Sequence, residues 1–597
     1  MKRFLCLLLC LLMAAALLAG CADEDGKKKE EDKGAIIPVY LSSPVGNFDP
    51  AYALHDNAGS KYIGLLYEGL FRLGKDGKLE KAIAKSWKIR EVPEDEYYMM
   101  EIELNTTYWS DGRQVAADDF VFAWKRLLEP EFQSEAASLL FEIKNARAVK
   151  DGDLTIDDLG LYAADTSVLQ IEFERKIDYN QFLENTASLA LVPLREDAVV
   201  KLVDWGSNSA TMTTNGPFIL KKIVYGADTF TLERIELERN VYYFRNVDRD
   251  ALKKSVFPYR FVIDFTKNVE EQAAAFDAGE IYLNANIPLS RRDAMSVELS
   301  DTMSTATVVF NNAKAPFDKP EVRRALSMAI DRNALVNTVK YAKAAEGFVP
   351  AGTFETTQGT SFRDAGAVIN AAGDIAGAKS LLSGAGVSGG SFEITIRAND
   401  EVYAAVAAAC VDAWSQLGFT VTVKELQMEY HIENEYDQYR DNFEVAYRAA
   451  DFDVILVDYY ASTNPFGTFA SFSRPFSGGA MDLATGSEYA NVPHICGYVS
   501  DSYDALIESA HTETDRAARA AILHQAEAAL ANDMPVAPLF NYQLAYAISG
   551  ELSKVGVKSD GYLTLTKARL KDYLKLQTTE TAATLAEGEE VTKAHDF

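Results

Sequence analysis

The sequence predicts an α/β protein, and the evidence is clearest between residues 390 and 460. Two segments rich in β-branched and aromatic residues, 392–396 and 419–423, flank the Ala-rich helical pattern of 403–417. Residues 454–457 then form a continuous apolar run, which is typical of a strand covered on both faces. A helix between two such strands favours parallel pairing, because the chain must cross back to the starting edge of the sheet.

The chain before this region predicts a mixture of strands and helices. Strands are indicated by alternating or β-branched apolar residues, and helices by apolar residues three or four positions apart. Asp118 and Asp119 lie in the first turn of one helix, where acids complement the dipole, and this explains the pair without catalysis. The expected strands are 36–40, 97–104, 168–174, 215–220, 229–237, 262–266, 281–287 and 303–311, and the expected helices are 61–70, 118–128, 179–187 and 269–278.

The second half continues this alternation. A helix begins at Pro320, whose fixed φ suits the first helical position, and its apolar residues keep helical spacing. The Phe-, Ser- and Gly-rich stretch 467–480 predicts a loop. The remaining expected elements are a helix at 374–382, one or two helices within 503–531, strands at 535–540 and 544–548, and a polar, disordered tail at 578–597.

The N-terminus indicates export. Lys2 and Arg3 precede a Leu- and Ala-rich segment that ends in Leu18-Ala19-Gly20-Cys21. The alternatives are a secretory signal or a membrane span, but the apolar run is short for a span and small residues directly precede the cysteine. The pattern resembles the bacterial lipobox, which implies cleavage of residues 1–20 and a lipid-modified Cys21. Residues 21–34 then form a charged, flexible tether that holds the protein at the outer face of the cell membrane.

Composition excludes some partners. The net charge of −29 disfavours nucleic acid, and no later stretch reaches the roughly 20 apolar residues of a membrane span. Cys410 and Cys496 remain after removal of the signal peptide and lipidation. Cys410 lies in a helical pattern and fits a buried hydrophobic residue, with a disulfide to Cys496 as the alternative. His494 and Cys496 form too small a cluster for a metal site, so no metal or other cofactor is expected.

The most informative stretch is the apolar run at 454–457 and the three residues after it. Asp458, Tyr459 and Tyr460 follow the run directly, and Asp458 shares a strand face with Leu456 and Tyr460. A carboxylate at the end of a buried strand is costly unless it is paired. The strand either emerges into solvent here or delivers an acid and aromatic rings to a ligand site.

Six motifs occur in an order that resembles one receptor family. They are LYEGLFRL, WSDGRQVAADDFVFAWKRLLEP, NGPFILKK, FNNAKAPFDKPEVRRALSMAIDR, AKSLLSGAG and YDALIESAHTETDRAARAAILHQAEAALANDMPVAPLF. Together with the lipobox they resemble the extracellular solute-binding proteins of oligopeptide and dipeptide ABC importers. The resemblance implies an α/β, two-lobed fold of the periplasmic-binding-protein type, with an extra α+β domain inserted in the first lobe and ligand held between lobes that close around a hinge.

The resemblance also implies domain boundaries. The first lobe is expected to be discontinuous, and the motif WSDG marks the inserted domain rather than the ligand site. Residues 35–66, 177–309 and 543–577 are assigned to the first lobe, 67–176 to the inserted domain and 310–542 to the second lobe.

The site residues follow from the same resemblance, position by position. Asp458, Tyr459 and Tyr460 lie in the strand where peptide-binding relatives meet the peptide backbone and its N-terminal ammonium. The sequence departs from that pattern, because Ala461 or Ser462 occupies the usual acid position and Leu456 the usual Arg position. Asp458 is expected to supply the acid from a shifted position. The other expected ligand contacts are His55, Asp56, Asn57, Asn284 and Asn286.

The expected function is a monomeric, lipid-anchored receptor that captures short peptides and delivers them to an ABC permease, without enzymatic activity. One alternative keeps the receptor but changes the solute to a sugar, an opine-like compound or a metal chelate. The other is a surface hydrolase that uses Asp453 and Asp458. These two residues are five apart on a strand and face opposite ways, and the chain lacks the G-x-S-x-G and H-E-x-x-H motifs.

Overall fold

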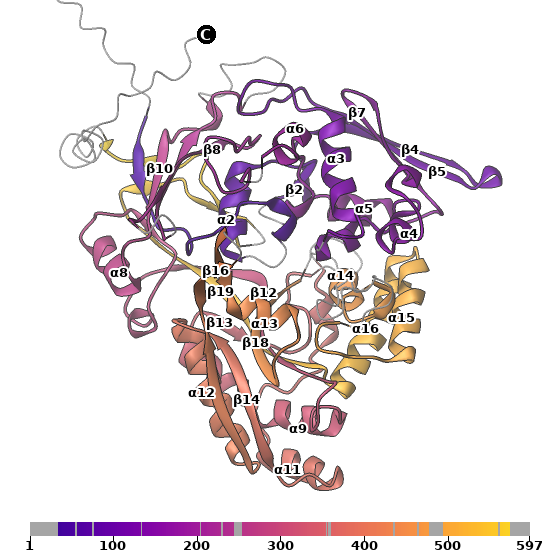
Figure 1. The fold of residues 1–597 in the computed structure, drawn as a ribbon, viewed down its shortest axis with the longest axis vertical. Coiled ribbons are helices and arrows are strands. Elements are labelled where there is room, and N and C mark those ends of the chain that lie inside the picture. Colours follow the sequence, from indigo (N-terminus) through magenta and orange to yellow (C-terminus); the bar gives the residue numbers. More distant parts are fainter. Residues whose placement is uncertain are drawn as a thin grey trace, which may run out of the picture.

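The protein has two lobes that lie one above the other in the computed structural model (Figure 1). The structure describes residues 34–53, 57–74, 77–132, 134–202, 204–227, 231–243, 254–353, 355, 360–433, 436–461, 465–476, 494–558 and 561–573. The expected signal peptide, the lipidated Cys21, nearly all of the tether and the tail at 578–597 lie outside these residues.

The first lobe contains a four-stranded sheet in the order β1-β10-β9-β8, in which only the β1–β10 pair is parallel. Residues 235–238 of β9 are all buried: Ile235 and Leu237 pack in the core on one face, and Glu236 and Glu238 on the other face pair with Arg260. The elements are β1 (Ile36–Pro38), α2 (Asn57–Leu66), α6 (Glu196–Val199), β8 (Phe218–Tyr225), β9 (Leu232–Arg239), β10 (Arg260–Asp264) and α8 (Val269–Asp277).

A separate antiparallel sheet, in the order β4-β5-β7-β6, lies beside the first lobe, and its β4–β5 hairpin projects sideways (Figure 1). Asp119 accepts hydrogen bonds from Trp109 Nε1 (2.8 Å) and from the Ala116 backbone (2.9 Å), so its role in the described structure is to fix the start of α3. The elements are β2 (Phe71–Leu73), β3 (Leu79–Lys81), β4 (Ala84–Val92), β5 (Tyr97–Leu104), α3 (Ala117–Leu128), α4 (Ala146–Lys150), β6 (Leu161–Asp165), β7 (Val168–Phe173) and α5 (Tyr179–Asn185).

The second lobe is built on a mixed sheet in the order β11-β19-β12-β18-β14-β15, with β13 paired to β19. The predicted parallel pairing is confirmed, because β14 pairs parallel with both β15 and β18. The strands are β11 (Leu283–Asn284), β12 (Glu298–Phe310), β13 (Ala342–Ala344), β14 (Gly390–Arg397), β15 (Phe419–Leu426), β16 (Met428–Glu433), β17 (Tyr436–Asp441), β18 (Val454–Tyr460) and β19 (Val536–Ile548). After β19 the chain returns to the first lobe, where the Phe257 N–H donates to the Thr566 oxygen at 2.8 Å (Figure 1). There it forms the short pairs β20 (Leu552–Ser553) with β23 (Arg569–Leu570) and β21 (Gly556–Val557) with β22 (Leu563–Thr564).

The helices of this lobe begin at side-chain caps that the sequence provides. Asp331, Asp374, Asp400, Ser500 and Asp515 each accept backbone N–H groups of the first turn, which would otherwise lack partners. The helices are α9 (Pro320–Ala329), α10 (Arg332–Val339), α11 (Ile375–Gly384), α12 (Glu401–Ser415), α13 (Asn442–Arg448), α14 (Pro465–Ala470), α15 (Asp501–Thr512) and α16 (Arg516–Asp533).

Strands β12 and β19 carry the chain between the lobes. They pair antiparallel from Val309 with Val536 to Glu298 with Tyr546, and the pairing is irregular between Asp301 and Thr305. Beyond this irregularity β19 pairs with β11, which in turn bridges to Tyr40 beside β1. A break in strand pairing at the crossing is a natural place for a hinge.

Several elements differ from the sequence prediction. Residues 535–540 and 544–548 belong to one continuous strand, β19, and 281–287 forms only the two-residue β11. The predicted loop at 467–480 was wrong in part, because α14 begins at Pro465, whose fixed φ suits a first helical position, and it buries Phe469. The prediction also lacked the β16–β17 hairpin and α13 before β18.

Two further expectations concern single features. Cys410 and Cys496 are both free and buried, so the alternative of a disulfide between them was wrong. Within the described ranges, none of the helices combines the length and the apolar character needed to cross a membrane. The domain boundaries remain a prediction.

Candidate functional site

The candidate site lies where β14 and β18 end, at the start of α12. The two strands run parallel, so their carboxyl ends meet at one edge of the sheet. The register of β18 against β12 places Tyr460 opposite Ser304, beside the part of β12 that comes from the first lobe. Asp458 therefore lies at the carboxyl-terminal edge of the strands, which is the usual ligand side of an open α/β sheet.

Asp458 faces the side of the sheet that α12 covers. It pairs with Ala306, which also pairs with Phe540, so Asp458, Phe540 and Tyr542 share one face. Hydroxyl groups of Tyr542 and Tyr403 hydrogen-bond the carboxyl group. Its Oδ1 is covered from solvent and has no hydrogen-bond partner in the described structure, and neither does the buried Ser304 Oγ on the same face. Two unsatisfied polar atoms on one face are unusual in a folded interior.

The electrostatic surroundings of Asp458 change the pKa of its carboxyl group in opposing directions. Burial raises the pKa of Asp458 to about 7, and the nearby carboxylate of Asp400 acts in the same direction. Hydrogen bonds from Tyr542 and Tyr403, and the positive charge of Arg397, oppose this rise. A cation bound beside Oδ1 would stabilise the charged form and lower the pKa of Asp458.

Asp400 fixes the geometry of this edge. Its Oδ1 accepts the backbone N–H groups of Val402 and Tyr403, both at 2.9 Å, and so caps α12 and positions the Tyr403 ring. Burial raises the pKa of Asp400, while these two hydrogen bonds lower it. Arg397, at the end of β14, pairs with Asp441, the cap of α13.

Tyr459 points away from Asp458, to the opposite face of the sheet. Its hydroxyl lies 3.1 Å from His494 Nε2, and the His494 ring stacks on Phe472 at 4.5 Å. The structure therefore does not bring Asp458 and Tyr459 together on one face. Leu456 is fully buried in the sheet, and the side chain of Tyr460 lies outside the described atoms.

Asn284 and Asn286 form a second polar cluster, on β11 and just after it. Asn284 is fully buried, and its Oδ1 accepts the Asn286 N–H at 2.9 Å. Asn286 Nδ2 donates to Gln272 Oε1 at 3.1 Å, and both amides hydrogen-bond Tyr40. Asn284 Nδ2 has no partner in the described structure. Strands β19 and β12 separate this cluster from Asp458 in the sheet.

The third expected group cannot be placed. His55 and Asp56 lie outside the described residues, and Asn57 begins α2 with a side chain that is also outside them. The residues missing from the sequence prediction are Tyr403, Tyr542 and Asp400. Asp400 could have been found as a helix cap directly after a strand, whereas Tyr542 comes from a strand 84 positions beyond Asp458 in the chain.

The arrangement suits binding rather than catalysis. Asp453, the second acid of the hydrolase alternative, contacts Lys314 at 3.3 Å and accepts the Glu393 backbone N–H at 3.2 Å. It stands before β18, at the opposite end of the strand from Asp458. Among the described residues, no three His, Cys, Asp or Glu side chains lie together as a metal site would require. The geometry provides the Asp458 carboxyl group, which is partly charged near pH 7 and is hydrogen-bonded by two tyrosine hydroxyls, with Oδ1 covered from solvent.

Comparisons with known proteins agree with this description. Residues 78–479 match the model for bacterial extracellular solute-binding proteins, family 5. The dipeptide-binding protein DppE of Bacillus subtilis is 27% identical over 92% of this chain and 95% of its own. The Haemophilus influenzae OppA complex with the peptide RPPGFSPFR superposes with a TM-score of 0.72, at 22% identity over 90% of this chain and 99% of that one.

A third relative has been solved in two forms. The murein tripeptide-binding protein MppA of Escherichia coli gives a TM-score of 0.72, at 23% identity over 90% of this chain and 98% of that one. Its unliganded open form gives 0.57, with 90% and 97% of the chains covered and the same identity. The fold is thus the two-lobed fold of these solved binding proteins. The chain belongs to the bacterial extracellular solute-binding proteins, family 5.

Proposed function

We propose that this protein captures short peptides between its lobes and delivers them to an ABC permease. Family membership supports a binding receptor, and the printed names of the relatives, a dipeptide-binding protein and OppA in complex with a peptide, support peptides as the ligand class. The lipobox-like Cys21 supports a lipid anchor that keeps the receptor beside the membrane.

The observation that most supports the peptide proposal is that Asp458 Oδ1 is covered from solvent and has no hydrogen-bond partner in the described structure. A covered carboxylate oxygen without a donor is costly in the ligand-free protein, and a peptide ammonium would supply both the donor and the opposite charge. The Tyr403 and Tyr542 hydroxyls hydrogen-bond the Asp458 carboxyl group, so its orientation is fixed before a ligand binds. Asn284 and Asn286 are proposed as further ligand contacts, on the first-lobe side.

One observation favours a second candidate, a non-peptide solute. Leu456 is fully buried, so the strand offers no Arg for a ligand carboxylate at this position. A solute with an amine or hydroxyl but no carboxylate would also satisfy Asp458. The two candidates share the same receptor fold and the same acid, and they differ in which ligands stabilise the protein.

Thermal shift and calorimetry with the purified chain distinguish them. Peptide pools of two to six residues are compared with panels of sugars, opine-like compounds and metal chelates. A ligand that binds only the folded state raises the melting temperature through RT ln(1 + [L]/Kd). A shift with peptides supports the proposal, and a shift with a non-peptide panel alone replaces it by the second candidate. Peptide and glycoside hydrolysis are measured in the same samples, and turnover would revive an enzymatic function.

Anchoring and assembly are tested separately. We expect the Cys21→Ala variant to leave the membrane fraction and the wild type to remain there, each as a monomer in light scattering. Mass spectrometry of the mature N-terminus checks for the lipid. An unmodified N-terminus, or equal release of both proteins, would refute the anchor without touching the ligand proposal.

A further inference from the structure

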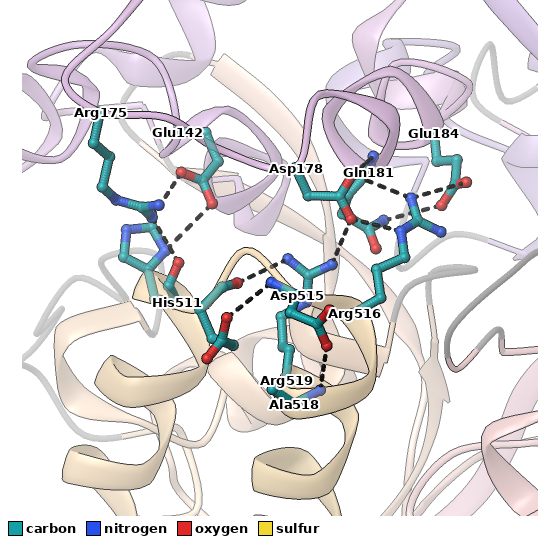
Figure 2. A network of polar contacts seen from close by, with 11 residues as sticks. Glu142, Arg175, Asp178, Gln181, Glu184, His511, Asp515, Arg516, Ala518 and Arg519 are labelled. Atoms are coloured by element: carbon teal, nitrogen blue, oxygen red, sulfur yellow. Dashed lines mark hydrogen bonds and ion pairs between the residues drawn. The ribbon is translucent and has the colours of Figure 1, made fainter. Parts of the chain in front are cut away.

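The two lobes are joined by a charged contact on the side away from the crossing strands. In Figure 1 the contact lies at the right, between α4 and α5 above and α15 and α16 below, while β12 and β19 lie toward the centre and left. Figure 2 shows its side chains, with Glu142, Arg175, Asp178 and Glu184 above and His511, Arg516 and Arg519 below. We call these seven residues the clasp.

The centre of the clasp is one carboxylate shared by two arginines of the other lobe. Asp178 accepts Arg516 Nε at 2.5 Å and Arg519 Nη2 at 2.8 Å, and Arg516 also reaches Glu184 at 3.3 Å. Asp178 and Glu184 expose less than a tenth of their side chains, and Arg519 a tenth. Two positive and two negative charges therefore meet in a mostly water-excluded contact and balance one another.

A second contact surrounds His511 at the end of α15. Arg175 donates to the His511 backbone oxygen at 2.6 Å and to Glu142 at 3.0 Å. His511 Nδ1 lies 3.6 Å from Glu142 Oε1. Burial, together with the positive charge of Arg175, lowers the pKa of His511 to about 3, so the ring is neutral and Arg175 carries the charge that faces Glu142.

The positive and negative charges of the clasp come from different lobes, apart from Arg175, which lies on the same side as Glu142. Arg516 and Arg519 lie in the first and second turns of α16, three positions apart, and the first turn contains no acid. A helix N-terminus disfavours positive charge, and two like charges at this spacing repel. Their neutralising acids come from α5 and its cap in the other lobe. Separation of the lobes would break the ion pairs of Asp178 and Glu184 with these arginines.

We propose that the clasp is a conformational latch that holds the receptor closed and sets its closed fraction independently of which ligand is bound. The structure in which the clasp is formed superposes better on the peptide complex of OppA, with a TM-score of 0.72, than on the open form of MppA, with 0.57. The apparent affinity of a closing receptor scales with the fraction that is competent to bind. A tenfold loss of the closed fraction thus weakens every ligand about tenfold, without a change in ligand preference.

Small-angle scattering of the ligand-free mature protein tests the latch. The double variant Arg516→Glu and Arg519→Glu places acids opposite Asp178 and Glu184, while it suits the N-terminus of α16, so the lobes should separate without unfolding. We expect a larger radius of gyration for this variant and partial return when Glu184→Arg is added. The control is Arg324→Glu, whose hydrogen-bond partner Asn532 lies in the same lobe, and it should scatter as the wild type does.

An unchanged radius of gyration in the double variant, with native circular dichroism, would overturn the latch. If the double variant fails to fold, the single variant Asp178→Asn decides, because it removes the charge that Arg516 and Arg519 share but keeps the shape of the side chain. We expect its radius of gyration to exceed that of the wild type. An unchanged radius of gyration in this variant would also refute the latch. No ligand is present in either experiment, so failure here is separate from failure of the peptide proposal.

Discussion

The hydroxyl of Tyr542, on the strand that passes between the lobes, hydrogen-bonds the carboxyl group of Asp458 on β18. The candidate ligand acid is therefore hydrogen-bonded to a strand that crosses between the lobes. A ligand that alters the charge of Asp458 therefore also acts on Tyr542. Tyr542 lies where the pairing of β19 with β12 is irregular, opposite Asp301 to Thr305.

The first prediction concerns the N-terminus of the ligand. Asp458→Asn keeps the shape of the side chain but removes its negative charge, so a peptide with a free N-terminus should lose about tenfold to hundredfold in affinity. The N-acetylated peptide should lose far less, because it brings no ammonium. Calorimetry with both peptides measures the difference, and equal losses would remove Asp458 from the ammonium site.

The second prediction is a pH dependence of affinity. The pKa of Asp458 is raised to about 7, so below that pH a proton increasingly competes with the ligand ammonium. Affinity for peptides with a free N-terminus should fall as pH drops from about 7 to 5 and also above about 8, where the ammonium itself deprotonates. Acetylated peptides provide the control. A flat profile for both ligand types would contradict the assignment.

The third prediction concerns stability without ligand. Because the folded pKa of Asp458 is above its unfolded value of about 3.9, the native state binds the extra proton between about pH 4 and 7, and stability falls as pH rises through this window. Asp458→Asn removes that loss and should stabilise the ligand-free protein at pH 7.5 by about 2 kcal/mol. Urea unfolding at pH 4 and 7.5 measures the effect, which should be small at the lower pH because Asp458 is then protonated in the native state and about half protonated in the unfolded chain.

The fourth prediction separates the role of the Tyr542 hydroxyl from that of its ring. Tyr542→Phe removes the hydroxyl that stabilises the charged carboxylate, so the pH midpoint of peptide binding should rise by about 0.5 to 1 unit. Tyr498→Phe is the matched control, because the Tyr498 hydroxyl bonds Asp533 instead, at 2.7 Å. If both variants keep the wild-type midpoint, the Tyr542 hydroxyl does not act on Asp458.

The fifth prediction tests a structural residue of the second lobe. Arg332 is fully buried and donates to the backbone oxygens of Pro538 (2.7 Å) and Ser327 (3.1 Å). Arg332→Ala leaves these acceptors unsatisfied and opens a cavity, so the free energy of unfolding should fall by about 3 to 5 kcal/mol. Arg324→Ala removes an exposed side chain of the same type from α9 and should change it by less than about 0.5 kcal/mol. Urea unfolding compares the two.

Much of the fold could be predicted from the sequence because its signals are local. Helical spacing placed α3 and α12 and the region of α15 and α16, and the apolar run at 454–457 placed β18. Strand β19 was split in the prediction because its middle residues, Asn541 to Gln543, are polar. Those residues are only partly buried, since the strand there leaves one lobe for the other.

The candidate site was predictable only in part. Asp458 has a local signal, an acid directly after an apolar run. The contribution of Tyr542 depends on which strand lies beside β12, and the sequence does not contain that pairing as a local pattern. The faces of Asp458 and Tyr459 follow from strand alternation, but what covers each face, α12 on one side and His494 with Phe472 on the other, is decided by tertiary packing.

The position of β19 also constrains how the protein can fold. This strand is interior to the sheet of the second lobe, but it is formed by residues 536–548, more than 220 positions after its neighbour β12. As the chain is made and exported, β12 therefore keeps one edge unpaired until residues 536–548 become available. Pairings this distant in sequence form slowly, and an exposed strand edge invites aggregation. We expect the nascent chain to depend on chaperones until residue 548 has emerged.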